Sequence, residues 1–148
     1  MNPVKNLLSY RYAEVIHDLT HQFCLSHLRY LSSLSRRNTD QMVQAARSGK
    51  QNIVEGIGQS QTSKKGEIKL LGVAKASFEE LQSDYEDFLR QQNLPIYPLT
   101  HPKVGIFRRL AYRLTDLRNL SNLGDLKEKP TLPGNPTDDA NHLLTLCH

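Results

Sequence analysis

The chain has 148 residues, 38% of them hydrophobic, and a formal net charge of +4. This length fits one domain with its own core, and so modest a charge permits contact with nucleic acid without requiring it. Two cysteines are too few for a disulfide framework, the first residues lack the apolar run of a secretory signal, and no stretch reaches the ~20 apolar residues that cross a bilayer. We therefore expect a cytoplasmic protein without membrane contact.

The first predicted helix covers about residues 9–34. Its apolar residues recur at alternating steps of four and three, a period that holds one stripe against neighbouring helices. The polar segment 35–40 is expected to break this helix, with Thr39 or Asp40 capping the next one. The stripe consists of Tyr12, Ile16, Leu19, Phe23, Ser26 and Tyr30.

The second predicted helix covers about residues 40–59, and most of its stripe is small. Glycine inside a helix costs up to ~1 kcal/mol relative to alanine. Gly49 and Gly56 lie seven residues apart on this stripe, which predicts that another helix approaches closely. The full stripe is Met42, Ala46, Gly49, Ile53 and Gly56.

The third predicted helix covers about residues 63–92 and has Ser63 as its N-cap. Its stripe is unbroken and again steps by three and four. Gly72 lies in the helix interior and predicts close packing or a slight bend at that point. The stripe consists of Leu71, Ala74, Phe78, Leu81, Tyr85 and Phe88.

A loop with three prolines, residues 93–102, precedes a fourth predicted helix over about residues 103–123. One face of this predicted helix carries Phe107, Leu110, Leu114 and Leu117, and Gly124 is placed to end the helix.

A last, short helix is predicted from Thr137 to His148. Thr137 is the expected cap, and the carboxylates of Asp138 and Asp139 suit the positive end of a helix. The preceding polar segment, which contains proline and glycine, has the composition of a linker.

These elements predict an all-α fold: an antiparallel up-and-down four-helix bundle with an extra helix or C-terminal extension. Residues 1–124 are the expected bundle domain, and residues 125–148 a linker plus a short helix that packs on the bundle or completes it. Two candidates for the fourth bundle helix stay open, residues 103–123 and residues 137–148.

One cluster has the spacing of metal ligands. His17 and His21 form an i, i+4 pair on the first helix, and Glu14 and Cys24 lie on the same face. The general-base glutamate of the HExxH motif is absent, because Asp18 follows His17, and a closed site needs further ligands. The competing interpretation is an amphipathic flank or a subunit contact, and we predict neither metal nor cofactor.

Other catalytic patterns are weak. Cys24 lies in an apolar stretch and Cys147 almost at the end, so neither has surroundings that activate a thiol. No G-x-S-x-G motif is present, and the glycines of segment 56–58 lack the spacing of a phosphate-binding loop. We predict that the protein is not an enzyme; a metal-dependent enzyme using the histidine pair is the minor alternative.

Charge is segregated along the chain. Basic residues gather between Arg29 and Lys75 and on the fourth predicted helix, whereas acids gather between Glu79 and Asp87. A positive face of this kind can follow a phosphate backbone, and ordinary solvated helix surface is the competing interpretation. The candidate nucleic-acid-binding residues are Arg36, Arg37, Arg47, Lys50, Lys64, Lys65, Arg108, Arg109 and Arg113.

Two segments resemble a known family. Residues 45–56 (AARSGKQNIVEG) resemble a small-residue helix leading into S-x-x-x-N-I-x-E-G, and residues 74–81 (AKASFEEL) resemble A-x-x-S-x-x-E-L. Both patterns are similar to those of a bacterial four-helix-bundle family. That family includes proteins encoded in intervening sequences of large-subunit ribosomal RNA genes, and the accessory variability determinant of diversity-generating retroelements.

The resemblance covers about half of the chain and implies an antiparallel four-helix bundle that assembles as a homopentamer without enzymatic activity. For the retroelement branch it also implies a basic surface that binds RNA and a reverse transcriptase. The chain departs from the family pattern at three positions: Gln44 replaces a common arginine, Gly49 a branched apolar residue, and Gln59 a basic residue.

The matched polar residues Asn52, Glu55, Ser77 and Glu80 lie beside the two stripes. If the helices pack closely, these groups become partly buried and need partners. We predict a hydrogen-bonded polar layer that fixes helix register, with a ligand site between the two glutamates as the alternative.

The function predicted from the sequence is that of a non-enzymatic module that forms a homo-oligomer and associates with RNA through its basic surface. The alternative is a protein-only assembly or accessory module without affinity for nucleic acid.

Overall fold

The structure is a computed structural model that describes residues 8–28, 33–115 and 135–147. In these residues all regular secondary structure is helical, which confirms the prediction of an all-α protein. In chain order the elements are α1 (Leu8–Phe23), the π-helical turn η2 (Cys24–Leu28), α2 (Ser33–Gly58), α3 (Lys64–Gln91), α4 (Pro102–Thr115) and α6 (Pro136–Cys147).

The second helix begins earlier than predicted. Residues 35–40 belong to α2, so the expectation that they break the first helix, with Thr39 or Asp40 as a cap, is wrong. The segment is polar but contains neither proline nor glycine. Nothing in its backbone chemistry forbids a helix, because polar side chains on an exposed turn weaken a helix only slightly.

The third helix has the predicted bounds and well-formed ends. Ser63 is its N-cap, and its Oγ accepts a hydrogen bond from Gly66 N at 3.0 Å. At the other end Asn93 adopts a left-handed backbone conformation, with φ of 55°. Leu94 N donates to Leu89 O at 2.8 Å and Asn93 N to Arg90 O at 3.1 Å, the pattern of a Schellman motif.

The last two helices also begin near the predicted positions, but α6 has a different cap. The Oδ1 atom of Asn135 accepts from Thr137 N at 2.9 Å, and Pro136 occupies the first helical position. The prediction that Thr137 caps this helix is therefore wrong by two residues. The predicted part of the fourth helix beyond Thr115 lies outside the described residues.

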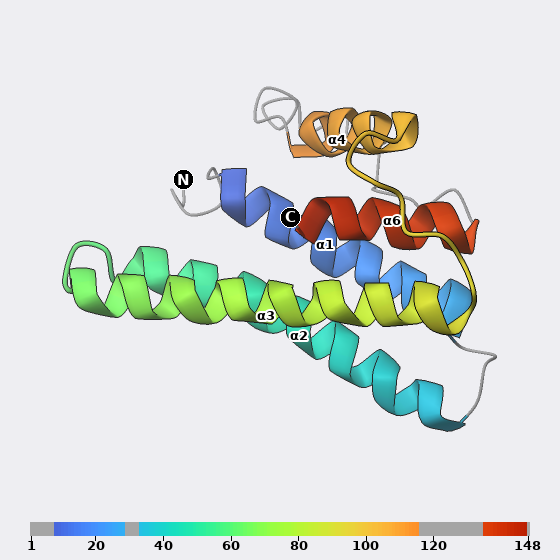
Figure 1. Ribbon diagram of the computed structural model, residues 1–148. Helices are drawn as coiled ribbons and strands as arrows, with labels where there is room; N and C mark the ends of the chain where they lie inside the picture. Colours follow the sequence, from blue (N-terminus) through green and yellow to red (C-terminus); the bar gives the residue numbers. More distant parts are fainter. Residues whose placement is uncertain (1–7, 29–32, 116–134, 148) are drawn as a thin grey trace, which may run out of the picture.

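Helices α1, α2, α3 and α6 lie side by side. In Figure 1 α1 and α3 run in one direction, α2 and α6 run in the opposite one, and α4 lies outermost, against α6 and α1. The most extensive contact joins α2 to α3, and α6 lies against both α1 and α3.

The main core is built from α1, α2, α3 and α6. From α6 it takes Leu143, which is fully buried, together with Ala140, Leu144 and Leu146. Helix α4 covers this core from outside with Val104 and Phe107, whereas Leu110 is 42% exposed. Phe107 and Leu110, which were predicted on one face of this helix, therefore differ in burial.

Helix α6 is shorter than α3 and lies beside only part of it. At 1.5 Å per residue α3 is about 42 Å long and α6 about 18 Å. Figure 1 shows α6 ending above the middle of α3. The buried residues of α3 accordingly begin at Ala74, and the first ten residues of the helix contribute none.

Candidate interaction surfaces

The α2–α3 contact is closest at Gly49. A Cβ atom built on Gly49 would lie 2.5 Å from Cζ of Phe78, far inside normal contact distance. At Gly56 the same atom would lie 3.3 Å from the Leu71 side chain, which is tight but can be relieved by a small shift. The ring of Phe78 therefore lies directly on the backbone of α2.

Near this contact a serine pair joins the two helices. Ser48 Oγ and Ser77 Oγ are 3.0 Å apart, and Asn52 Nδ2 donates to Ser48 O at 2.8 Å. Ser77 is buried and Asn52 half-buried. Glu55 and Glu80, in contrast, are exposed. The expectation that the two glutamates become partly buried is therefore wrong.

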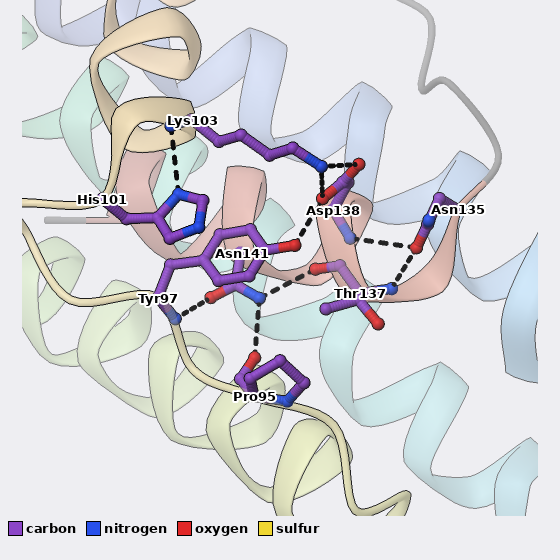
Figure 2. A network of polar contacts seen from close by, with 8 residues as sticks. All are labelled: Pro95, Tyr97, His101, Lys103, Asn135, Thr137, Asp138 and Asn141. Atoms are coloured by element: carbon purple, nitrogen blue, oxygen red, sulfur yellow. Dashed lines mark hydrogen bonds and ion pairs between the residues drawn. The ribbon is translucent and has the colours of Figure 1, made fainter.

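A polar junction fixes the start of α6. Figure 2 shows Tyr97 and Lys103 converging on Asp138: Tyr97 Oη donates to Oδ1 at 2.5 Å, and Lys103 Nζ lies 3.0 Å from both carboxylate oxygens. Burial alone would raise the pKa of Asp138, but hydrogen bonds from Tyr97 and Lys103 and the lysine charge outweigh it and lower the pKa.

Asn141 continues this junction into the loop before α4. Its Oδ1 accepts from Tyr97 N at 2.7 Å, and its Nδ2 donates to Pro95 O at 3.0 Å and to Thr137 O at 2.8 Å (Figure 2). The amide thus uses both of its polar atoms. It holds the proline loop against the first two turns of α6 and so determines where that helix lies.

Aromatic rings extend the junction to α4. Tyr97 stacks on His101 with ring centroids 4.1 Å apart, and Phe107 stacks on His142 at 4.8 Å. His142 is buried, and its Nε2 has no hydrogen-bond partner among the described residues. Burial lowers the pKa of His142 to about 4, so this imidazole is neutral at neutral pH.

A second tie to α6 comes from η2. His27 Nε2 lies 2.7 Å from Asp139 Oδ2, and the Asp139 side chain is fully buried. Phe23 packs against the His27 ring with centroids 5.0 Å apart. The two adjacent acids of α6 therefore have different partners. Asp138 contacts Tyr97 of the proline loop, and the buried Asp139 contacts His27.

An open groove lies beyond the end of α6. It has a volume of about 1000 Å³, and residues from α1 and α3 form its walls. Ile53 of α2 contributes to the floor, the last turn of α6 lines it, and Arg108 of α4 reaches its edge. Its apolar lining includes Tyr12, Ile16, Leu71, Phe78 and Leu146.

The outer face of α3 carries a separation of charge. It starts with exposed lysines, passes through Gly72 and Ala76, and ends in exposed acids. Asp84 lies at the inner margin of the acids: burial first, then the charges of Glu80 and Asp87, raise its pKa to about 6. We call this strip the outer face of α3; it comprises Lys65, Ile68, Lys69, Gly72, Ala76, Glu79, Glu80, Ser83, Glu86 and Asp87.

The predicted nucleic-acid-binding residues lie on three separate helices. Arg47, Lys64, Lys65, Arg108 and Arg109 are exposed, on α2, α3 and α4. Lys50 is half-buried, and its Nζ lies 3.0 Å from Nδ1 of His17. The side chains of Arg36, Arg37 and Arg113 lie outside the described residues.

The candidate metal ligands of α1 are not brought together. Glu14 pairs with Arg11, His21 is exposed and Cys24 is buried in the core. Burial and the charge of Lys50 lower the pKa of His17. Over the described ranges, no three His, Cys, Asp or Glu side chains are placed to hold a metal ion. Burial also raises the pKa of Cys24 and of Cys147 to about 12, so both thiols are protonated at neutral pH.

Sequence reasoning missed the residues of the polar junction. Tyr97, Asn141 and His142 lie in a proline loop and on a short helix, and no periodic pattern links them. Only the consecutive acids Asp138 and Asp139 gave a signal, and they were attributed to the helix dipole alone. The pairing depends on the loop folding back over α6, which local sequence does not encode.

No protein-family model, curated protein or solved structure matches this chain. None of the helices in the described ranges combines the length and the apolar character needed to cross a membrane.

Proposed function

We propose that this chain is a non-enzymatic interaction module that self-associates through the outer face of α3. One observation carries the proposal: this exposed strip is basic at one end and acidic at the other. A helix with this polarity is complementary to an antiparallel copy of itself. Such a contact is isologous, since the same surface on both subunits makes it.

The middle of the strip suits close contact. Gly72 and Ala76 are exposed and small, and a Cβ atom on Gly72 would meet nothing within 4 Å. Two antiparallel copies of α3 centred on Ala76 would place Lys65 of each chain opposite Asp87 of the other, with Lys69 within one turn of Glu86. Charge complementarity of this kind sets the orientation of partners and speeds their encounter.

The scaffold for this role is an antiparallel up-and-down four-helix bundle of α1, α2, α3 and α6. Three observations support this assignment: the shared core, the alternating helix directions in Figure 1, and the contacts of α6 with α1 and α3. Helix α4 then lies outside the bundle, which leaves α2 and α3 free to present their outer surfaces.

Light scattering tests self-association directly. The unmodified chain is expected to have the mass of a dimer at low salt and to dissociate as ionic strength rises. Reversal of the basic end (Lys65→Glu with Lys69→Glu) or of the acidic end (Glu86→Lys with Asp87→Lys) should give monomers. An equimolar mixture of the two variants should recover the dimer, because each supplies the charge that the other lacks.

Arg109→Glu, an equally exposed reversal on α4, is the control and should leave the mass unchanged. A mass of five subunits would instead support the ring implied by the family resemblance. Monomers at all concentrations would contradict self-association altogether.

RNA association is a second candidate, favoured by α4, which has no acidic residue among its 14. Binding to a single-stranded RNA should weaken as salt rises, because bound phosphates release counterions. Arg108→Gln with Arg109→Gln and Arg113→Gln should flatten that dependence. Lys103→Gln is the matched control on the same helix, because Asp138 already engages the lysine. Absence of measurable binding at low salt would leave the protein-only module.

A further inference from the structure

Helix α6 fills only part of the trough that α1 and α3 form. It lies against both helices and buries Ala140, Leu143 and Leu144 there, with Leu146 near its end. The polar junction of Figure 2 and the Asp139 pair with His27 fix its start. Within the described residues, α6 ends above the middle of α3 (Figure 1).

The open groove is the continuation of this trough. The last turn of α6 lines it, and its walls come from the same two helices that hold α6. Along α3 the lining residues Leu71, Ala74 and Phe78 step by three and four, and along α1 Ser9, Tyr12 and Ile16 do the same. Both walls therefore present helical stripes, a form that fits another helix running along the trough.

Apolar surface remains exposed on the α3 wall. Leu71 is 37% exposed, and Phe78 is only partly buried although its ring packs on Gly49. Along the rest of the trough, the equivalent stripe of α3 is covered by α6, and Leu81, Tyr85 and Leu89 are fully buried. The same helix thus has a covered half and an uncovered half on one continuous face.

The edge of the groove toward α4 is cationic. Arg108 lines it and is exposed, and α4 contributes no carboxylate to balance that charge. On the opposite wall Lys75 lies 3.9 Å from Glu79, a weak ion pair between two largely exposed side chains. An occupant with acidic residues toward α4 would meet the positive charge of Arg108, for which no carboxylate partner is found among the described residues.

From these observations we propose that the open groove binds an amphipathic helix of a partner protein. This helix carries a leucine-rich stripe like that of α6, flanked by acidic residues on the side that faces Arg108. Helix-in-groove recognition uses such anchors at i, i+3, i+4 and i+7. The inference rests on the proposed role as an interaction module, but it needs neither self-association through α3 nor RNA.

Designed peptides of 16 residues provide a defined probe, since helices much shorter than this are marginal in water. The first has leucines on one face and glutamates beside them. The second has the same composition in scrambled order, and the third has lysine in place of each glutamate. Fluorescence anisotropy with the labelled peptides and the full chain should show saturable binding of the first peptide only.

Matched variants place the binding in the groove. Leu71→Glu and Arg108→Glu should each weaken binding at least about tenfold. Val73→Glu and Arg109→Glu should leave it unchanged, because both residues are exposed and lie on the same two helices outside the groove. If Leu71→Glu fails to fold, Arg108→Glu still tests the groove, because Arg108 is exposed and its replacement should not disturb folding. Circular dichroism checks the fold of both variants.

Three results would overturn the proposal. Equal binding of the scrambled peptide would mean non-specific hydrophobic association. Equal losses in the groove variants and their matched controls would place the peptide elsewhere. A change in the mass of the free chain on Arg108→Glu alone would show that a second copy occupies the groove. Light scattering without peptide separates this last result from failure of the α3 dimer, which depends on Lys65 and Asp87 instead.

Discussion

The two halves of α3 show how differently one helix can be used. Its C-terminal half is enclosed by three other helices, and its Tyr85 hydroxyl lies 2.8 Å from that of Thr20 within the core. Phe23 meets both Tyr85 and Phe88 edge to face, with centroids 5.0 Å apart. Its N-terminal half contacts α2 through Gly56 and Leu71 and leaves Ile68 71% exposed.

This contrast separates residues that hold the fold together from residues available for partners. Aromatic and leucine side chains fill the enclosed half, where burial of each one contributes about 1.5–3 kcal/mol. In the open half the same stripe continues, but the structure covers it only from one side. The amphipathic pattern of α3 therefore continues beyond the part that the other described helices cover.

The largest expected effect comes from comparing a leucine-to-alanine substitution in each half of α3. Leu81→Ala in the enclosed half should lower the free energy of unfolding by about 2–5 kcal/mol, because Leu81 is fully buried and a cavity remains. Leu71→Ala in the open half should cost less than about 1 kcal/mol, since part of the side chain is already in water. Chemical denaturation of both variants measures the difference. Equal losses would mean that the open half is enclosed in solution.

A somewhat smaller effect is expected from pH and involves His142 of α6, one of the helices that enclose the C-terminal half of α3. The imidazole takes up a proton near pH 6.5 when unfolded but only near pH 4 when folded. Between these values the unfolded chain binds more protons, so stability falls as the pH falls, by up to about 3 kcal/mol.

His142→Leu should remove this loss, and the test compares unfolding of both proteins at pH 7 and at pH 4.5. Asp84 acts in the opposite direction, because its folded pKa is about 6 and its ordinary value 3.8. It is present in both proteins, so its contribution cancels in the comparison. Parallel pH profiles would contradict the buried, neutral state of His142.

Sequence periodicity predicted the long helices well and their junctions poorly. The stripe of α3 and the Ser63 cap are local features, and both were predicted correctly. The junction before α2 was misplaced because polar residues without proline or glycine suit a helix as well as a turn. Nor could periodicity decide between α4 and α6 as a core helix, since both carry apolar stripes. That choice depends on the proline loop, whose contacts with Asp138 and Asn141 span more than 40 residues.

The glycines show the same limit at the level of one residue. Gly49 and Gly72 are both interior helix glycines; close packing was the prediction for Gly49, and close packing or a slight bend for Gly72. Only Gly49 faces another helix tightly; Gly72 is exposed with open space around it, so the expectation of close packing within the chain is wrong there. The sequence shows that an interior glycine weakens its helix. It does not show whether close packing within the same chain offsets that loss.

An intermediate effect is expected at Gly49, where α2 meets the end of the enclosed half. Gly49→Ala should destabilise the protein by about 1–3 kcal/mol, because the new methyl group overlaps the Phe78 ring. The gain in helix propensity of up to about 1 kcal/mol offsets only part of this cost. In a Phe78→Leu background the same substitution should be almost neutral. A double-mutant cycle measured by denaturation gives the coupling, and a coupling of zero would show that the ring moves aside freely.

The smallest effect, and one of opposite sign, is expected at Gly72 in the open half. Gly72→Ala should raise the free energy of unfolding by about 0.5–1 kcal/mol, since alanine restricts the unfolded chain and meets no neighbour in the folded one. For a chain of this length that corresponds to a rise in melting temperature of about 2–4 °C at most. Measuring the effect of Gly72→Ala in two backgrounds, the unmodified chain and the monomeric Lys65→Glu, Lys69→Glu variant, tests whether Gly72 lies in the interface. If two copies of α3 approach each other at Gly72, the added methyl group lies between them, so the unmodified chain should gain less stability and dissociate at lower salt. The same gain in both backgrounds, with no change in dimer mass, would remove Gly72 from the interface and shift the contact toward the charged ends of the helix.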